Sequence, residues 1–169
     1  MKRYLILTAA VFFVIFSFGQ QGFGFGVGFS TSKAPMVNVK YFFDRNAVSL
    51  GGSYQAFNDA LGKKLDEPKP GASVIGDGDY FYSVDIGYTR ILNEKFSLSG
   101  EVSIAKKIFY QNFTDYSFSQ GGYHHTYKTI SETGIGVFGT YYFNDVLGVF
   151  AGYNTKRQAF IGLDVRFLQ

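Results

Sequence analysis

The sequence predicts an all-β protein, an eight-stranded antiparallel up-and-down transmembrane β-barrel preceded by a cleaved signal peptide. Residues 22–29 alternate glycine with Phe or Val. Side chains along a strand point alternately to its two faces, so one face of this strand is apolar and the other is bare backbone. The same alternation recurs down the chain, and short turns at one end of the predicted strands contrast with longer segments at the other. Together these features are typical of outer-membrane barrels.

Length and composition exclude several other classes. The chain has 169 residues, which suggests one domain. Aromatic residues make up 20% and charged residues 17%, a composition too apolar for disorder. The net charge is +3 and the basic residues form no stripe, so nothing indicates nucleic-acid binding. The absence of cysteine excludes disulfides and thiolate metal sites.

The N-terminus reads as a processing signal. Lys2 and Arg3 precede an apolar run over residues 4–18, and Ser17 and Gly19 supply small residues near its end. A membrane-spanning helix needs about 20 apolar residues, so this run is short for an anchor. We assign residues 1–20 to a secretory signal peptide and residues 21–169 to the barrel. The alternative is an uncleaved anchor helix.

Period-2 alternation between turn residues defines the strands. The eight predicted strands are residues 22–30, 36–44, 47–57, 80–91, one that begins at Phe96, one that ends at Asn144, 146–153 and 158–168. In each strand, large apolar residues occupy every second position. In the first strand, glycine fills the positions between them. Examples on the predicted lipid face are Val37, Val39, Val48, Leu50, Val84, Ile86, Leu98, Val102, Ile135, Val137, Leu147, Val149, Ile161 and Leu163.

The connections predict which end of the barrel is which. Tight hairpin turns at residues 44–46, 92–95 and 144–145 lie at one end. Long segments at residues 58–79 and 107–132 lie at the other. In outer-membrane barrels the short turns and the termini are periplasmic and the long loops extracellular. An even number of strands closes the sheet and leaves no edge in lipid.

A soluble, lipocalin-like barrel with its apolar face inside is the rival architecture. Three observations argue against it. The apolar face carries too much volume for the interior of eight strands. The opposite face is rich in glycine and serine, which is unusual for a solvated exterior. Aromatic residues gather at the predicted periplasmic end, as expected of an interfacial girdle: Tyr41, Phe43, Tyr88, Phe96, Tyr141, Phe143 and Phe167.

Two hairpins carry a family resemblance. Residues 41–50, YFFDRNAVSL, and residues 142–145, YFND, resemble the aromatic–turn–apolar hairpins of the small outer-membrane β-barrels, the OmpA/OmpX-like group. The resemblance covers residues 21–169 and implies an outer-membrane location with periplasmic termini. It also implies contact between the C-terminal strand and the barrel-assembly machinery. Members of this group usually end in an aromatic residue, and here Phe167 stands third from the end.

The inward face predicts a closed interior. Its ionisable residues include Lys40, Asp85, Glu101, Glu132, Asp164 and Arg166. Unpaired charges are costly in a narrow interior, so we expect these groups to pair. Aromatic side chains such as Phe42 and Phe138 share this face and fill space. We therefore expect a structural polar network, with a gated ion path as the alternative.

The segment at residues 107–132 predicts a protruding β-hairpin. Its aromatic residues are candidates for contact with a partner: Phe109, Tyr110, Phe113, Tyr116, Phe118, Tyr123 and Tyr127. The alternative is that these rings pack on one another. Lys106, Lys107 and Lys128 lie where lipid phosphates are expected, and we treat them as candidate contacts to those phosphates.

The functional prediction is a non-enzymatic outer-membrane barrel with a structural or surface-interaction role, such as adhesion or envelope protection. Alternatives are a small channel or secretion accessory and, less favoured, a lipid-modifying enzyme. His124 and His125 are the only histidines, and no nucleophile motif surrounds them. We expect no cofactor, metal or nucleic acid. Expected partners of this monomer are outer-membrane lipid, including lipopolysaccharide, the assembly machinery, and an extracellular protein or glycan.

Overall fold

A computed structural model describes residues 21–56, 58–118 and 121–168. These residues form nine strands joined by turns and loops. The strands are β1 (Gln21–Ser30), β2 (Pro35–Phe43), β3 (Asn46–Tyr54), β4 (Lys63–Leu65), β5 (Val74–Ile91), β6 (Phe96–Thr114), β7 (Gly122–Tyr142), β8 (Leu147–Asn154) and β9 (Gln158–Leu168). The predicted signal peptide, residues 1–20, lies outside the described residues.

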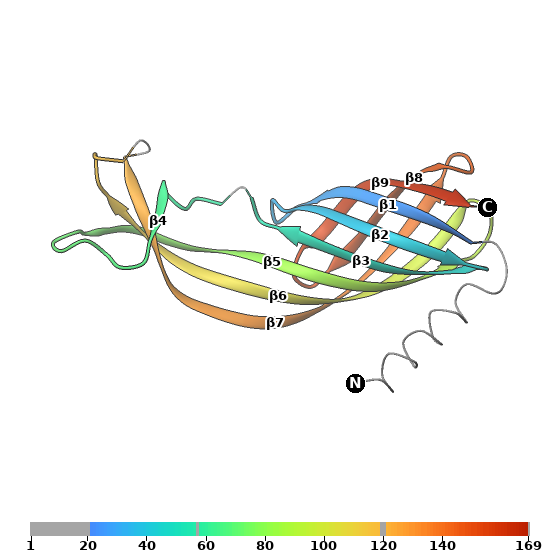
Figure 1. Ribbon diagram of the computed structural model, residues 1–169, viewed down its shortest axis with the longest axis horizontal. Coiled ribbons are helices and arrows are strands. Elements are labelled where there is room, and N and C mark those ends of the chain that lie inside the picture. Colours follow the sequence, from blue (N-terminus) through green and yellow to red (C-terminus); the bar gives the residue numbers. More distant parts are fainter. Residues whose placement is uncertain (1–20, 57, 119–120, 169) are drawn as a thin grey trace, which may run out of the picture.

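Eight of these strands close into a ring (Figure 1). Each pairs antiparallel with the next in the order β1, β2, β3, β5, β6, β7, β8, β9, and β9 pairs back onto β1. The ninth strand, β4, stands outside the ring and pairs parallel with Tyr123–His125 of β7. The predicted eight-stranded up-and-down barrel is therefore confirmed. Across the described ranges, no helix is long and apolar enough to cross a membrane.

The alternation in β1 places its large residues outside. Phe23, Phe25, Val27 and Phe29 are exposed on the exterior, and the intervening glycines face inward. The other barrel strands repeat this arrangement, with exposed residues that include Val39, Leu50, Ile86, Ile104, Ile135 and Ile161. An exterior this apolar matches lipid rather than water. The soluble alternative, with the apolar face inside, is wrong.

Inward glycines of β1 make room for side chains from neighbouring strands. A Cβ atom on Gly24 would lie 2.9 Å from the Phe42 ring, and one on Gly28 would lie 2.9 Å from the Phe150 ring. The Cβ of a larger residue at Gly28 would also lie 2.7 Å from the carbonyl oxygen of Ile161. All three distances are shorter than side chains tolerate without movement. Glycine is required here because interior rings and the adjacent backbone approach closely.

Aromatic side chains pair on the exterior near the end of the barrel that carries both Gln21 and Leu168. The Phe23 and Tyr41 ring centroids lie 5.2 Å apart, and those of Phe96 and Tyr141 lie 4.9 Å apart. We call this the terminal end of the barrel. The opposite end is the protruding end, because three strands continue beyond it.

Strand length produces the protrusion. β5, β6 and β7 have 18, 19 and 21 residues, whereas the other barrel strands have 8 to 11. The excess length extends past the barrel as a curved three-stranded sheet that carries β4 (Figure 1). We call residues 74–81, 106–114 and 122–134 of these strands the protruding sheet.

Strand boundaries differ from the prediction at two places. β3 ends at Tyr54 rather than at residue 57, and β5 begins at Val74 rather than at residue 80. Residues 76–79 read GDGD and have no apolar alternation, because this stretch pairs with β6 beyond the lipid-facing band. The predicted contrast between short turns at one end of the barrel and long segments at the other also holds only in part. Residues 31–34 and 155–157 form short connections at the protruding end.

The glycine face gives a stability prediction. We expect Gly28→Val to lower the free energy of unfolding by about 1–3 kcal/mol, because the added methyl groups overpack the interior. Gly139→Val is the matched control, because a Cβ there lies on the exposed face, 3.9 Å from the Ser97 carbonyl oxygen. Both variants are unfolded with urea in micelles. The folded fraction is read from the different gel migration of folded and unfolded protein. Equal stability of the two variants would contradict this account of the glycines.

Candidate functional site

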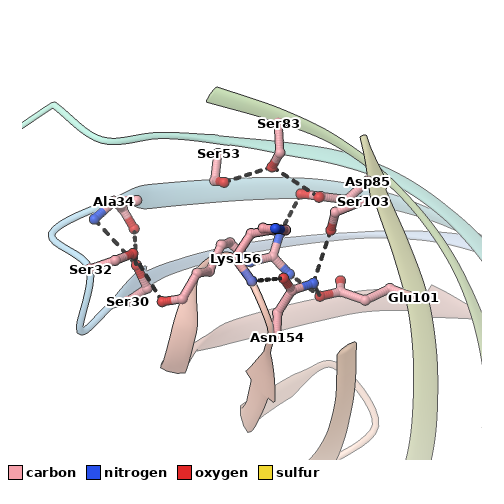
Figure 2. A network of polar contacts seen from close by, with 11 residues as sticks. Ser30, Ser32, Ala34, Ser53, Ser83, Asp85, Glu101, Ser103, Asn154 and Lys156 are labelled. Atoms are coloured by element: carbon pink, nitrogen blue, oxygen red, sulfur yellow. Dashed lines mark hydrogen bonds and ion pairs between the residues drawn. The ribbon is translucent and has the colours of Figure 1, made fainter. Parts of the chain in front are cut away.

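Arg157 holds together the first polar cluster inside the barrel. Its side chain enters from the turn between β8 and β9 and is only 1% exposed. One guanidinium nitrogen donates to Asp85 of β5 and the other to Glu101 of β6. Asn154 donates to Glu101 over 2.7 Å and to the Ser103 hydroxyl over 2.9 Å. We call these five residues the Arg157 cluster, and Figure 2 shows Asp85 of β5, Glu101 and Ser103 of β6, and Asn154 of β8 converging.

Serine hydroxyls of β5 and β3 extend this cluster along the inner face of the barrel. Ser83 donates to the Asp85 carboxylate over 2.9 Å, and its hydroxyl lies 2.8 Å from that of Ser53 (Figure 2). The acids of the cluster therefore have neutral partners as well as the guanidinium. This arrangement satisfies carboxylates whose burial would otherwise be costly.

A second cluster lies deeper and rests on Lys40. The Lys40 ammonium and the Asp164 carboxylate are 2.6 Å apart, and both side chains are fully buried. The Tyr142 hydroxyl donates to the other Asp164 oxygen over 2.5 Å. These three residues form the Lys40 cluster. Each charge is paired, as expected of ions in a narrow interior.

An aromatic layer separates the two clusters. Phe138, Phe150 and Phe160 pack together with Met36, with ring centroids 5.8 to 6.1 Å apart. The Phe160 ring faces the Arg157 guanidinium at 4.9 Å, and the Phe138 ring faces the Lys40 ammonium at 5.6 Å. The layer thus contacts a cation on each side and favours both through cation–π attraction.

Two predicted members of the network lie at the ends of the barrel. Arg166 stacks on the Tyr142 ring at 3.7 Å and donates to the carbonyl oxygens of Asp145 and Glu94 over 3.0 and 2.7 Å. It therefore ties two turns at the terminal end. Glu132 pairs with Lys156 over 2.6 Å at the protruding end.

Of the six residues singled out in the sequence, the structure thus brings together Asp85 with Glu101, and Lys40 with Asp164. Sequence reasoning missed Arg157, because it lies in a turn outside the strand alternation. Two inward acids near each other, with no base beside them on their own strands, are a signal that a cation must reach them from elsewhere.

Cavities lie at both ends of the barrel, and the interior between them is filled. A cavity of about 550 Å³ opens at the protruding end, lined by polar residues that include Lys33, Asp79 and Gln158. Another of about 940 Å³ lies at the terminal end, beside Asn93 and Arg166. A third, much smaller void of about 10 Å³ lies within the barrel. The polar clusters and the aromatic layer therefore close the barrel, which supports the predicted plug.

The aromatic residues of the protruding sheet divide into buried and exposed sets. Phe113 and Tyr123 stack with centroids 5.1 Å apart and are buried, as is Tyr110. Phe118 packs against Tyr123 at 5.6 Å, and Phe109 lies 6.4 Å from Tyr127. Tyr116 is 90% exposed and Tyr127 51% exposed. The exposed rings stay accessible at the surface, and the buried ones stabilise the sheet.

The segment between β3 and β5 folds onto this sheet. The Asn112 side chain accepts from the Leu61 amide and donates to the Asp59 carbonyl oxygen, both over 2.9 Å. The His124 ring nitrogen Nδ1 donates to the Leu61 carbonyl oxygen over 2.8 Å, and that of His125 to the Leu65 carbonyl oxygen over 3.2 Å. A carbonyl only accepts, so both Nδ1 atoms carry hydrogen. The histidines tether a loop.

A salt bridge fixes the same segment at the tip. The Lys69 ammonium and the Asp115 carboxylate lie 2.5 Å apart. Hydrogen bonds from Lys69 and Ser117 lower the pKa of Asp115 to about 2. The Lys69 amide also donates to the Tyr123 hydroxyl over 2.8 Å. Residues 59–69 therefore form part of the protruding sheet's folded structure.

The three candidate lysines lie on different surfaces. Lys106 is exposed on the outer face, in register with Tyr82 and Ser131. Lys107 faces the other way and pairs with Asp79 over 2.8 Å. Lys128 lies opposite Phe109, with its ammonium 5.6 Å from that ring. The structure thus places only Lys106 directly beyond the lipid-facing residues. Within the described ranges, no group of three or more His, Cys, Asp or Glu residues could hold a metal ion.

Comparison with known proteins identifies the class. Ail, the attachment invasion locus protein of Yersinia pestis, matches with a TM-score of 0.51 at 15% identity, over 88% of this chain and 95% of Ail. Ail in complex with the heparin analogue sucrose octasulfate matches with a TM-score of 0.50 at 15% identity, over 88% and 96%. The N-terminal β-barrel domain of Pseudomonas aeruginosa OprF gives 0.49 at 13% identity, over 88% and 97%.

The chain therefore has the fold of the small eight-stranded outer-membrane β-barrels, as the hairpin resemblance indicated. At these identities the similarity shows the fold alone. No protein-family model matches the sequence, and the search of curated proteins found no match.

The Arg157 cluster gives a second stability prediction. Arg157→Met leaves two buried carboxylates without their cation, so we expect a loss of about 3–5 kcal/mol in the free energy of unfolding. Adding Asp85→Asn and Glu101→Gln removes the uncompensated charge and should recover most of that loss. Arg90→Met is the control, because Arg90 is exposed and bonds only to the Asn46 side chain in the described structure. Urea unfolding in micelles measures all three, and an Arg157→Met variant as stable as Arg90→Met would refute the assignment.

Proposed function

We propose that this protein is a non-enzymatic outer-membrane barrel whose protruding sheet stands outside the cell and docks an extended segment of a partner protein. The termini are periplasmic in this proposal. The closed interior supports a role at the surface rather than in transport. The Nδ1 atoms of His124 and His125 donate to backbone carbonyl oxygens of the folded-back loop, so a structural role accounts for both histidines.

The observation that carries the proposal is an open edge on β7. β7 pairs with β6 along its whole length, with β8 from Gly136 to Tyr142, and with β4 at Tyr123–His125. Between these last two pairings, no described strand covers residues 126–134 of β7. An exposed strand edge presents unpaired N–H and C=O groups that accept a further strand. β4 already adds to this edge in just this way.

The backbone groups that point to the open edge follow from the neighbouring turn. The Ile135 amide donates to the Thr155 hydroxyl over 3.1 Å, and the Ile135 carbonyl oxygen accepts from the Thr155 amide over 3.0 Å. Backbone groups alternate direction along a strand. Thr129, Ser131 and Thr133 therefore direct their N–H and C=O groups to the same edge, away from β6. This edge can satisfy the backbone of one added strand.

A sulfated or phosphorylated ligand is the weaker candidate. Sucrose octasulfate is a ligand of Ail. In the present cavity at the protruding end, Lys107 and Lys156 are already paired with Asp79 and Glu132. An anion would compete with those carboxylates. Two subsidiary proposals remain. Lys106 contacts lipid phosphates, and Phe167 takes part in recognition by the barrel-assembly machinery.

The orientation has a direct test, since the chain contains no cysteine. A Tyr116→Cys variant should react with a membrane-impermeant maleimide on intact cells, because Tyr116 is fully open at the tip of the protruding sheet. Asn93→Cys, in a turn at the terminal end, should react only after the envelope is permeabilised. The opposite labelling pattern would reverse the orientation.

The docking edge is tested by removing one edge donor. Ser131→Pro deletes an N–H that faces the open edge, and proline is tolerated on edge strands. Ser131→Ala keeps that N–H. The probes are peptides selected from a library for binding to the wild-type protein in micelles. They should bind the Ser131→Ala variant as tightly as wild type. They should bind the Ser131→Pro variant at least about tenfold more weakly, because one hydrogen bond or more is lost. Equal binding to both variants, with unchanged gel migration of the folded form, would contradict the proposed docking edge.

A further inference from the structure

The void inside the barrel has polar walls that carry unused hydrogen-bonding groups. It measures about 10 Å³ and lies between the Arg157 cluster and the aromatic layer. Its lining includes Met36, Asn38, Asp85, Glu101, Phe138 and Arg157. Four of these six side chains are polar or charged, so the void differs from an apolar packing defect.

Two atoms of the lining have no protein partner among the described residues. They are the Asn38 side-chain oxygen Oδ1 and the Arg157 nitrogen Nε. Asn38 is 9% exposed and Arg157 1% exposed. A buried polar atom without a partner costs about 1–3 kcal/mol. One of these atoms is an acceptor and the other a donor, which is the complement that a single small molecule with both functions can satisfy.

We propose that this void is the binding site of one structural water molecule. The water accepts the Arg157 Nε–H and donates one O–H to Asn38 Oδ1. Its second O–H faces the carboxylates of Asp85 and Glu101, which line the same void. A buried water needs about 10–15 Å³ of such space and two to four polar partners, and the void provides both.

The charges around the void favour water over an ion. An anion would face two carboxylates and the Asn38 carbonyl oxygen. A cation would face the Arg157 guanidinium and would leave its Nε–H without an acceptor. Water is the occupant that uses the donor and the acceptor together.

The site also explains why Asn38 is placed where it is. A Cβ on Gly26 would lie 2.7 Å from the Asn38 side-chain nitrogen and 3.1 Å from an Asp164 carboxylate oxygen. Asn38 therefore lies beside Asp164 of the Lys40 cluster as well as beside the void. The proposed water joins Asn38 to the Arg157 cluster.

The test is a high-resolution crystal structure of the whole protein from crystals grown in rubidium bromide. We expect one isolated density peak within about 2.7–3.2 Å of both Asn38 Oδ1 and Arg157 Nε, with no anomalous signal. Asn38→Leu should abolish the peak, whereas Ser97→Ala should retain it. Ser97 also has an unpartnered buried hydroxyl but does not line the void.

Two results would overturn the proposal. Wild-type crystals with well-ordered Asn38 and Arg157 side chains and no density in the void would show that it is dry. An anomalous peak at the site would show rubidium or bromide and therefore an ion site. The wild-type crystals decide the matter even if a variant does not fold.

Discussion

The ion pairs of Arg157 are the interaction on which the closed interior depends. Lipid outside the barrel forces a closed ring of strands, and eight strands leave an interior only wide enough for packed side chains. Two carboxylates from adjacent strands project into that space. One guanidinium neutralises them from a turn, and it contacts the aromatic layer beneath. Without it, the same acids would repel each other and draw in water.

The unequal strand lengths then separate two tasks. The residues of β5, β6 and β7 nearest the terminal end complete the barrel wall, and their excess length builds the protruding sheet. Inside the barrel, each of the eight ring strands pairs with a neighbour on both sides. In the protruding sheet, one edge of β7 has no neighbour over residues 126–134 in the described structure. The proposed docking edge therefore lies where the barrel's own pairing ends.

The wall of the barrel follows from period-2 alternation, which lipid enforces directly. For that reason the sequence sufficed to predict the eight strands and their outward residues. Alternation weakens where lipid no longer selects, so the start of β5 at Val74 and the short strand β4 were missed. Arg157 was missed for a related reason, because a turn residue has no face assigned by periodicity.

The same limit applies to the protruding aromatics. Their spacing predicts a hairpin but cannot say which rings another segment covers. The loop held by Asn112, His124 and His125 lies between β3 and β5, far away in the sequence. Only the tertiary structure shows that Tyr123 is buried and Tyr116 is exposed.

The central claim is that the barrel is closed and acts through its protruding sheet. Single-channel recording in planar bilayers tests it most directly, using purified folded protein and, as a control, the same preparation unfolded by heat. A closed barrel should give no sustained current steps. Reproducible single-channel steps that are absent from the unfolded control would contradict it and favour the small-channel alternative.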